Sequence, residues 1–372
     1  MGKLDYLKQF ESGSTVRAYR AALKKFFQTI YNVAEPNLEE SAEKYFAENR
    51  NYEGDVQTFM VALKEAPPKT RRLYLTAVKV FLLENGVELS QLFWRRLKAR
   101  IKGSEAVSEE KVPTKEQLRS VFMHLPVHGK ALFLTLLSSG MRIGECLQLK
   151  IDDVDLTSDP PVVHVRAEYS KTGQKRITFI SQEAKQAILE WLKVRGSYIQ
   201  AAAGRSHIYA KPTEDGRLFP FTSVNARVMW HNALKKTGNG QVDPRTKRML
   251  MRPHVLRKFF RSMLGSQSVD MAEALMGHSG YLTQVYRKYP DPEKTLAEFY
   301  RRNEHLLLIF TDESTVQKVA EKQSELEQQT KQQQAIINGL VAENLALKEK
   351  ISKVEKKLAE VEELLRRLIG ES

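Results

Sequence analysis

The chain has 372 residues, of which 42% are hydrophobic, and it carries a formal net charge of +14 with an isoelectric point near 9.6. This length can bury two sizeable cores, and the positive charge favours a polyanionic partner, nucleic acid first and an anionic membrane surface second. No apolar run approaches membrane-spanning length and the start lacks the apolar stretch of a signal peptide, so we expect an intracellular, cytoplasmic protein. The single cysteine, Cys146, excludes an intrachain disulfide and a thiolate-rich zinc site, and no other metal-ligand spacing is present, so no metal is expected.

The first hundred residues predict a helical domain. In TVRAYRAALKKFFQTIY, with Thr15 as the expected N-cap, apolar side chains recur on one helical stripe: Tyr19, Leu23, Phe26, Phe27 and Ile30. The later segment SQLFWRRLKARIKG crowds basic side chains together: Arg95, Arg96, Lys98, Arg100 and Lys102. With Trp94, this density favours a helix laid against DNA phosphates, and a solvated helix face is the alternative. We therefore predict a helical DNA-binding domain over residues 1–103.

A second domain is expected after a linker. The stretch GSEAVSEEKVP is small and acidic without periodicity, which indicates a linker at 104–112, and Thr114 and Gln117 have the spacing of a capping box that opens a domain over 113–310. Apolar and polar residues alternate on both sides of SKTGQ, which predicts a two-stranded antiparallel hairpin with Gly173 in the turn. Helical patterns surround this hairpin, so the predicted fold class is α-rich α+β.

Two stretches in the first half of this domain could carry chemistry. In SSGMRIGECLQL, Arg142 and Glu145 are three residues apart and share a helix face, so the acid could hold the guanidinium against an anion. A surface salt bridge is the alternative. Lys171 and Lys175 flank the hairpin turn, where a lysine could protonate a leaving oxygen or contact phosphate, and an ordinary exposed lysine is the alternative.

Two later stretches add histidines, arginine and tyrosines. In RPHVLRKFFRSML an apolar stripe leaves His254 and Arg257 together on the opposite face of the first helical turn, where a helix N-terminus favours phosphate. EALMGHSG predicts a helix that ends at Gly277 with His278 just beyond it, and YLTQVYRKYP predicts a short helix stopped by Pro290. Exposed helix residues and half-buried packing tyrosines are the alternatives here.

Taken in order, these four stretches resemble the catalytic domain of the tyrosine recombinases, the phage-type integrase and Xer-like family. The matching motifs are SGMRIGECLQL, KTGQKR, HVLRKFF and LMGHSG followed by a nearby tyrosine. The stretch STVRAYRAALKKFF also looks like the family's helical core-binding domain, so the resemblance covers roughly residues 10 to 305. It implies a site-specific recombinase that acts on double-stranded DNA without a metal, nucleotide or other cofactor.

Carried over position by position, the resemblance implies a role for each matching residue. Arg142 and Arg257 would clamp the non-bridging oxygens of the scissile phosphate, with Glu145 orienting Arg142. His254 would help to take the proton from the nucleophile, and Lys171, preferred over Lys175, would protonate the departing 5′ oxygen. His278 would hydrogen-bond the phosphate or the nucleophile. The reaction would pass through a 3′-phosphotyrosyl intermediate, which conserves the bond energy and needs no ATP.

The spacing of the nucleophile departs from the family's pattern. In Xer-like members the tyrosine lies one residue farther from the histidine than Tyr286 does here, and Tyr289 lies farther still. We predict Tyr286, because it falls inside the short helix, whereas Tyr289 precedes Pro290 and is pushed toward an extended conformation. Tyr289 is the alternative nucleophile, and Tyr281 comes too soon after His278.

The last part of the chain, residues 311–372, predicts a coiled-coil tail. From Val316 to Leu368 the sequence sustains a heptad repeat, and Ile at a with Leu at d around Asn344 favours a parallel dimer. A lone helix folded back on its own domain is the alternative. Recombinases of this family are expected to act as tetramers on paired sites, so the tail could tie protomers together.

The expected reaction is integration or excision of a mobile element, with resolution of dimers and inversion of segments as alternatives. It would take place in the cytoplasm at the nucleoid, or in the host cell of a mobile element or virus. Two other functions use the same residues or the same charge. A type IB topoisomerase would relax one duplex by the same chemistry, and a non-catalytic DNA-binding relative would keep the charge and the tail.

Overall fold

The structure is a computed structural model of the chain, and it describes residues 2–103, 112–170, 173–204, 214–244 and 246–311, with residues 329–361 of the tail except 331, 335, 341–343, 345, 346 and 349. Contacts divide the chain into two compact units. The N-terminal unit comprises Met1–Glu109 and Val242–Leu250, and the C-terminal unit comprises Glu110–Gln241 and Met251–Ser372. The linker expected at 104–112 lies outside the described residues apart from its last residue. Within those described ranges, no helix is both long and apolar enough to cross a membrane.

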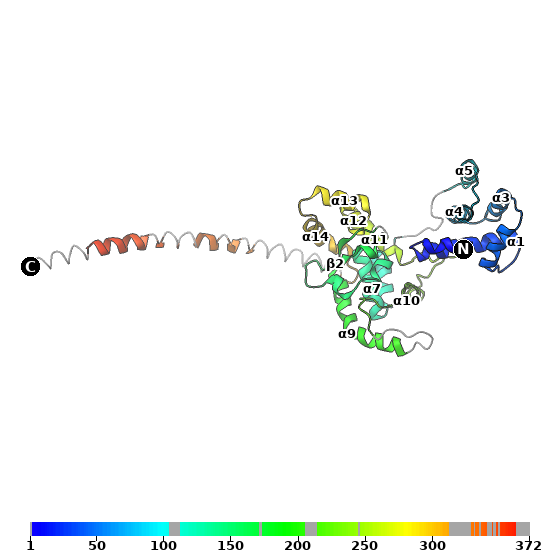
Figure 1. Ribbon diagram of the computed structural model, residues 1–372. Coiled ribbons are helices and arrows are strands. Elements are labelled where there is room, and N and C mark those ends of the chain that lie inside the picture. The colour runs from blue at the N-terminus through cyan, green and yellow to red at the C-terminus, as the bar shows by residue number, and fades with distance from the viewer. Residues whose placement is uncertain are drawn as a thin grey trace, which may run out of the picture. The chain divides into compact units, whose positions relative to one another are not determined.

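The described part of residues 2–103 is helical. A short 3-10 helix is followed by the α-helices of this unit, labelled in part in Figure 1: η1 (Asp5–Gln9), α1 (Gly13–Tyr31), α2 (Leu38–Ala47), α3 (Tyr52–Ala62), α4 (Pro68–Glu84) and α5 (Gln91–Ala99). The N-cap of α1 is Ser12, whose Oγ accepts the backbone N–H of Thr15, so the expected N-cap at Thr15 was wrong. Ser12 lies one turn earlier and offers the same hydroxyl acceptor.

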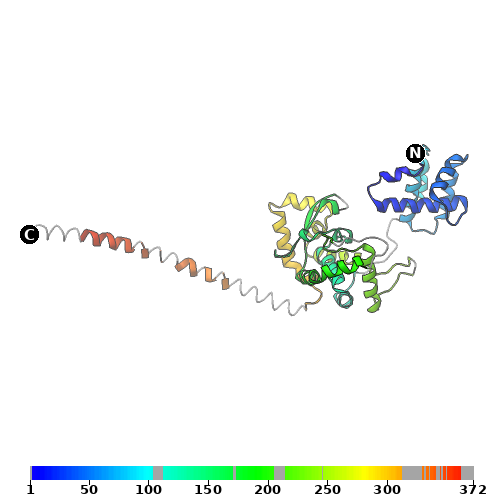
Figure 2. The same ribbon diagram turned by 60° about the horizontal axis from the view of Figure 1, so that its bottom comes forward.

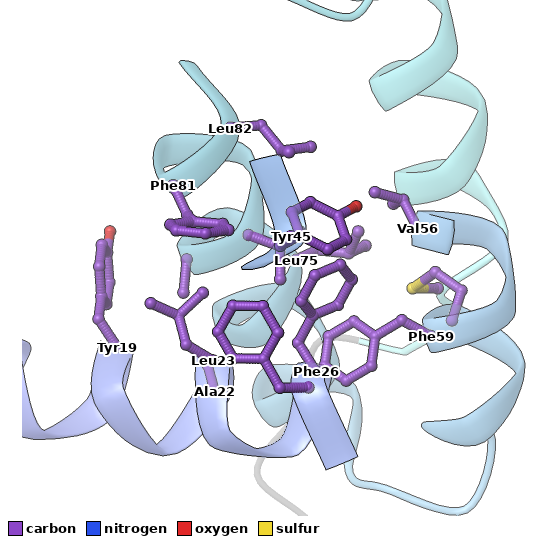
Figure 3. Close-up of a cluster of buried hydrophobic side chains, with 14 of the residues drawn as sticks. Tyr19, Ala22, Leu23, Phe26, Tyr45, Val56, Phe59, Leu75, Phe81 and Leu82 are labelled. Atoms are coloured by element: carbon purple, nitrogen blue, oxygen red, sulfur yellow. The ribbon is translucent and has the colours of Figure 1, made fainter. Parts of the chain in front are cut away.

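Apolar and aromatic side chains fill the centre of these helices. Figure 3 shows the cluster, in which α1 contributes Phe26 beside Tyr45 of α2 and Phe59 of α3. The ring centroids of Phe26 and Phe59 are 5.2 Å apart and nearly perpendicular, the edge-to-face arrangement that aromatic rings prefer. The predicted stripe of α1 is confirmed, because four of its five side chains are buried and Ile30 packs against them.

The C-terminal unit mixes helices with a small sheet. Thr114 and Gln117 form the expected capping box at the start of the first helix. The elements up to the last strand are, in chain order, α6 (Lys115–Met123), α7 (Val127–Ser139), α8 (Ile143–Cys146), η2 (Ile151–Asp153), β1 (Val154–Asp155), β2 (Val162–Val165), η3 (Ala167–Tyr169) and β3 (Arg176–Phe179). The later elements are α9 (Gln182–Gly204), α10 (Ser223–Lys236), α11 (His254–Gly265), α12 (Val269–Met276), α13 (Ser279–Lys288), α14 (Pro292–Asn303) and η4 (Glu304–Leu307).

The sheet is antiparallel in the order β1-β2-β3, with Val163 opposite Val154 on one side and Thr178 on the other. The helix-rich fold with a small antiparallel sheet is as predicted. The expected two-stranded hairpin was incomplete, because β1 adds a third strand and η3 lengthens the connection between β2 and β3. Gly173 does lie in the turn, with a positive φ of 66°.

Helix α7 is the centre of the unit. Every residue from Ala131 to Gly140 is buried, and α7 packs against both α9 and α11. Helices α12, α13 and α14 pack against one another at one end of the unit, as the yellow ribbons show from two sides (Figures 1 and 2). The end of α7 therefore lies next to the helices that carry the later predicted site residues.

The chain is anchored where it leaves this unit. The carboxylate of Glu183, in the first turn of α9, accepts the backbone N–H groups of Ile309, Phe310 and Thr311. Beyond this point the described residues between 329 and 361 are helical, and their side chains are exposed. The first part of the predicted heptad repeat, residues 316–328, lies outside the described residues.

Candidate active site

Arg142 stands at the start of α8, immediately after a tight turn that ends α7. Gly140 makes this turn with a φ of 64°, and a Cβ atom there would lie 2.5 Å from the ring of Phe260, so the position requires glycine. Arg142 donates from Nη1 to Glu145 Oε1 at 3.0 Å, and its backbone N–H donates to Glu145 Oε2 at 2.9 Å. The Glu145 side chain is 2% exposed and that of Arg142 is 32% exposed. The acid is therefore buried beneath an arginine that reaches the surface.

Arg257 is buried, although the sequence pattern placed it opposite the apolar stripe of its helix. Its guanidinium donates to the carbonyl oxygen of Gly140, to that of Met276 at 3.0 Å, and to Nε2 of His278 at 3.0 Å. These acceptors are all uncharged. Arg257 thus joins the end of α7 to the turn between α12 and α13.

The surroundings of Arg257 disfavour its positive charge. Burial lowers the pKa of Arg257 to about 10, and the nearby charge of Arg142 acts in the same direction. Among the described residues, no carboxylate lies within ion-pair distance of Arg257. A buried cation without a direct counterion is costly, and an incoming anion would relieve that cost. The arrangement is therefore that of an anion site.

His254 begins α11 one helical turn before Arg257. Partial burial lowers the pKa of His254 below its usual range, and the positive charges of Arg257, Lys258 and Arg142 lower it further. Its ring makes no hydrogen bond to the described residues. The neutral imidazole is thus favoured near pH 7, where it can accept a proton.

His278 follows the left-handed turn at Gly277 and is held from both sides. Because arginine can only donate, Nε2 of His278 must accept the bond from Arg257, and its Nδ1–H then donates to the carboxylate of Glu273. Glu273 also accepts from Arg261. Burial alone would raise the pKa of Glu273, but the hydrogen bonds from Arg261 and His278 outweigh it and leave the pKa below its usual range.

Arg176, the first residue of β3, is an additional charged residue of the site. Its side chain is 1% exposed and donates from Nη2 to Glu145 Oε2 at 2.7 Å. Burial alone would raise the pKa of Glu145, but Arg176 first and Arg142 second outweigh it and lower that pKa. Glu145 therefore remains ionised between two arginines.

Sequence reasoning missed both Arg176 and Glu273. Arg176 stands at a polar position of an alternating strand and so looked solvent-facing, yet every residue of β3 is buried. Glu273 was the stronger available signal, because it is the one charged residue within the otherwise apolar MAEALM, five positions before His278.

The remaining predicted residues, the lysines and the tyrosines, are described by the structure only in part. Lys171 lies outside the described residues, and its alternative, Lys175, is exposed. Tyr286 lies in α13, where only its backbone is described. Tyr289 is the C-cap of α13 with an extended backbone, as Pro290 predicted. Tyr289 and Met271 are among the residues that line an open cavity of about 470 Å³ between α12 and α13.

The basic segment of the N-terminal unit is displayed on and just after α5. All five predicted cations are exposed: Arg95, Arg96, Lys98, Arg100 and Lys102. Trp94 was wrongly grouped with them, because its side chain is 4% exposed and belongs to the hydrophobic core. The basic face is therefore carried by a helix whose aromatic residue points inward.

Sequence comparison assigns the C-terminal unit. The model of the phage integrase family matches residues 111–293, which include Arg142, His254, Arg257, His278 and Tyr286. The tyrosine recombinase XerA of Saccharolobus solfataricus is 24% identical over 280 residues, covering 73% of this chain and 81% of that protein. The tyrosine recombinase XerD of Rickettsia conorii is 27% identical over 161 residues, covering 42% of this chain and half of the relative's length.

Structural comparison gives the same fold. A crystal structure of lambda integrase (75–356), a dimer bound to a COC′ core site, aligns with a TM-score of 0.51 and 14% identity, covering 76% of this chain and 93% of that chain. Another crystal structure of a lambda integrase dimer bound to a COC′ core site aligns with a TM-score of 0.51 and 16% identity, covering 80% of this chain and 76% of that chain. The structures show the fold. The family match and the tyrosine recombinase relatives identify residues 111–293 as a phage integrase family domain and the protein as a site-specific recombinase.

Proposed function

We propose that the protein cleaves and rejoins double-stranded DNA through a 3′-phosphotyrosyl intermediate, for integration or excision of a mobile element. The hydroxyl oxygen of Tyr286 attacks the scissile phosphorus, the bond from phosphorus to the 5′ oxygen breaks, and the departing oxygen takes a proton to become a free 5′ hydroxyl. A second strand's 5′ hydroxyl reverses these steps. One phosphodiester is exchanged for another, so no nucleotide is consumed.

Each residue of the site has a part in this reaction. Arg142 and Arg257 bind the non-bridging oxygens and stabilise the charge that develops on them. His254 accepts the phenolic proton, which matters because a free tyrosine has a pKa near 10 and is a poor nucleophile at neutral pH. Lys171 protonates the 5′ oxygen, and His278 hydrogen-bonds the phosphate or the nucleophile.

The observation that carries the proposal is that Arg257 is buried and, among the described residues, donates only to uncharged acceptors, although Glu145 and Glu273 lie near enough to act on its charge. Its pKa is lowered to about 10 by burial and by Arg142, so the free protein holds positive charge in a place that favours an anion. A scissile phosphate would supply that anion. Neutral His254, one turn away, then lies close to the bound phosphate.

DNA contacts outside the active site are proposed for the five basic residues on and after α5, and the tail is proposed to pair protomers. The exposed cations of that segment suit phosphate contacts, which release counterions and weaken with added salt. Exposed apolar side chains at heptad positions of the described tail, including Leu347, Ile351 and Leu358, support a parallel dimeric coiled coil through 316–368. Paired dimers would give a tetramer on two sites.

The chemistry is tested by covalent trapping. Duplexes with a randomised centre and a nick a few nucleotides beyond it are incubated with the protein, so that the short cleaved piece diffuses away and the adduct accumulates. Adducts are purified under denaturing conditions, amplified and sequenced to give the preferred site. Wild type, Tyr286→Phe and Tyr289→Phe are then compared on that site, and the attached peptide is mapped by mass spectrometry.

An adduct lost only in Tyr286→Phe is the expected result. Loss only in Tyr289→Phe would move the nucleophile to the helix end, whereas no adduct from wild type would favour a non-catalytic DNA-binding protein. The tail is tested separately by deleting residues 316–372 and measuring the mass of free and DNA-bound protein. An unchanged oligomeric state would remove the coiled-coil proposal.

A further inference from the structure

The Glu145 carboxylate is shared between two arginines in an ordered way. Its Oε1 accepts Nη1 of Arg142 at 3.0 Å and Nη1 of Arg176 at 3.5 Å. Its Oε2 accepts the backbone N–H of Arg142 at 2.9 Å and Nη2 of Arg176 at 2.7 Å. Both oxygens are therefore occupied, and only one nitrogen of the Arg142 guanidinium is used by the described protein.

The other edge of Arg176 reaches the opposite side of the site. Its Nε donates to the carbonyl oxygen of Leu275 at 3.2 Å. Gly277 has a φ of 78°, and a Cβ atom there would lie 2.6 to 2.7 Å from the Arg176 guanidinium. The flat guanidinium thus fills the space that a side chain at 277 would need, directly beside His278.

Stability does not account for this placement. Two arginines on one buried carboxylate leave excess positive charge, and apolar groups of similar size often stabilise a core at least as well as a buried ion pair. Arg176 also adds to the positive field on Arg257, one of the phosphate-binding candidates. A role in positioning its neighbours explains why Arg176 is buried between Glu145 and the turn at Gly277, which the free energy of folding does not.

We propose that Arg176 is a positioning residue that holds Glu145 away from full pairing with Arg142 and seats the turn that carries His278. This inference rests on the proposed function. If Arg176 is absent, the carboxylate is free to turn both oxygens toward the Arg142 guanidinium in a bidentate pair, which neutralises Arg142 and withdraws its free edge from phosphate. With Arg176 in place, one nitrogen of the Arg142 guanidinium bonds Glu145 and the other edge stays available to the substrate phosphate.

The test compares Arg176→Met with wild type in single-turnover cleavage of the selected nicked duplex. A second duplex carries a methylphosphonate at the scissile position, which replaces one charged oxygen by a neutral methyl group. We expect Arg176→Met to slow cleavage of the phosphate duplex about tenfold to a hundredfold, the range seen for outer-shell partners, with the Kd for DNA within about twofold of wild type. The loss on the methylphosphonate duplex is expected to be much smaller, because less charge depends on Arg142.

Arg166→Met is the matched control. Arg166 also pairs with a buried carboxylate, Asp153, at 2.6 Å in the same unit, and its contacts among the described residues, Asp153 and Tyr169, lie outside the site. Its cleavage rate is expected to match wild type on both duplexes. Arg176→Lys keeps the charge without the planar fork, and it decides the question if Arg176→Met does not fold. Its expected rate on the phosphate duplex lies between those of wild type and Arg176→Met.

Two results would overturn the inference while leaving the proposed function intact. One is a folded Arg176→Met protein that cleaves the phosphate duplex within about twofold of wild type or, where that variant does not fold, an Arg176→Lys protein that does so. The other is an equal loss on both duplexes, which indicates a general structural role. Absence of cleavage by wild type overturns the proposed function and this inference with it.

Discussion

The two units bury different kinds of side chain. Among residues 2–103 every buried side chain is hydrophobic, whereas the C-terminal unit buries Glu145, Arg176, Arg257 and Glu273 in one neighbourhood. Apolar burial is the ordinary source of folding free energy, and buried charge opposes it unless each charge is paired and hydrogen-bonded. The N-terminal unit therefore buries only groups that favour folding. The C-terminal unit also buries charged groups, which cost folding free energy but hold a fixed electrostatic field at the site.

The largest expected effect is on the stability of the N-terminal unit. Phe26→Ala removes a fully buried ring from the cluster in Figure 3 and is expected to cost about 3–5 kcal/mol of that unit's free energy of unfolding. Peptide-resolved hydrogen exchange measures this loss within residues 2–103. Leu83→Ala, at a side chain that is 50% exposed on α4, is the control and should change little. Equal loss of protection in the C-terminal unit would contradict the separation of the two cores.

The matching change in the C-terminal unit should affect rate more than folding. Arg257→Lys keeps a positive charge but cannot bond the two carbonyl oxygens, His278 and a phosphate together. We expect single-turnover cleavage to fall about 10²- to 10³-fold, the size of a lost donor to a developing oxyanion. Arg301→Lys, at an exposed pair with Asp159, is the control. Cleavage within about threefold of wild type would show that Arg257 does not bind the reacting phosphate.

The difference between an apolar core and buried charges also decides which features could be predicted from the sequence. Periodicity located α1 and its buried stripe because an apolar core leaves a repeating pattern, and turn chemistry located the helix end at Gly277. Thr15 was one turn too late because several hydroxyl residues in SGST could cap the helix. Trp94 was misread because tryptophan suits both a core and a phosphate-facing surface.

Buried charges are harder to predict because sequence patterns are interpreted on the assumption that charged residues are exposed and apolar residues are buried. Arg176 looks polar and therefore exposed, and only tertiary contacts with Glu145 and Leu275 reveal its position. Arg257 was placed on the correct helix turn, but its burial depends on Gly140 and Met276, which come from other elements. Local sequence contains the residue types of a site and not the partners that surround them.

The pH dependence of the cleavage rate tests the effect of the buried charges on His254. The pKa of His254 is lowered by partial burial and nearby cations, so the ring stays neutral and able to accept a proton below its ordinary pKa of 6.5. The cleavage rate should therefore fall only below that value as the pH decreases, and His254→Gln should lack this acidic limb. Single-turnover rates between about pH 5 and 8 measure it. An acidic limb at or above 6.5 in wild type, lost in the variant, would contradict the predicted direction.

The smallest effect concerns acid stability. The folded pKa of Glu273 lies below the unfolded value near 4.5, so this carboxylate stabilises the fold at neutral pH and the stabilisation is lost as the pH falls through the folded pKa. Glu273→Gln should reduce the loss of stability between neutral and acidic pH. Urea unfolding of a Trp94→Phe protein isolates the C-terminal unit, because the remaining Trp191 and Trp230 are both buried there. An unchanged pH dependence would assign the acid sensitivity to other groups.

The Glu183 anchor has a mechanical consequence. One carboxylate holds three successive amide groups, Ile309 to Thr311, and Ile309 is fully buried beside it. A pull on the chain beyond Thr311 therefore loads several hydrogen bonds together and passes into α9 and the central α7 packed against it. The anchor therefore ties the start of the tail to the helices in the middle of the unit.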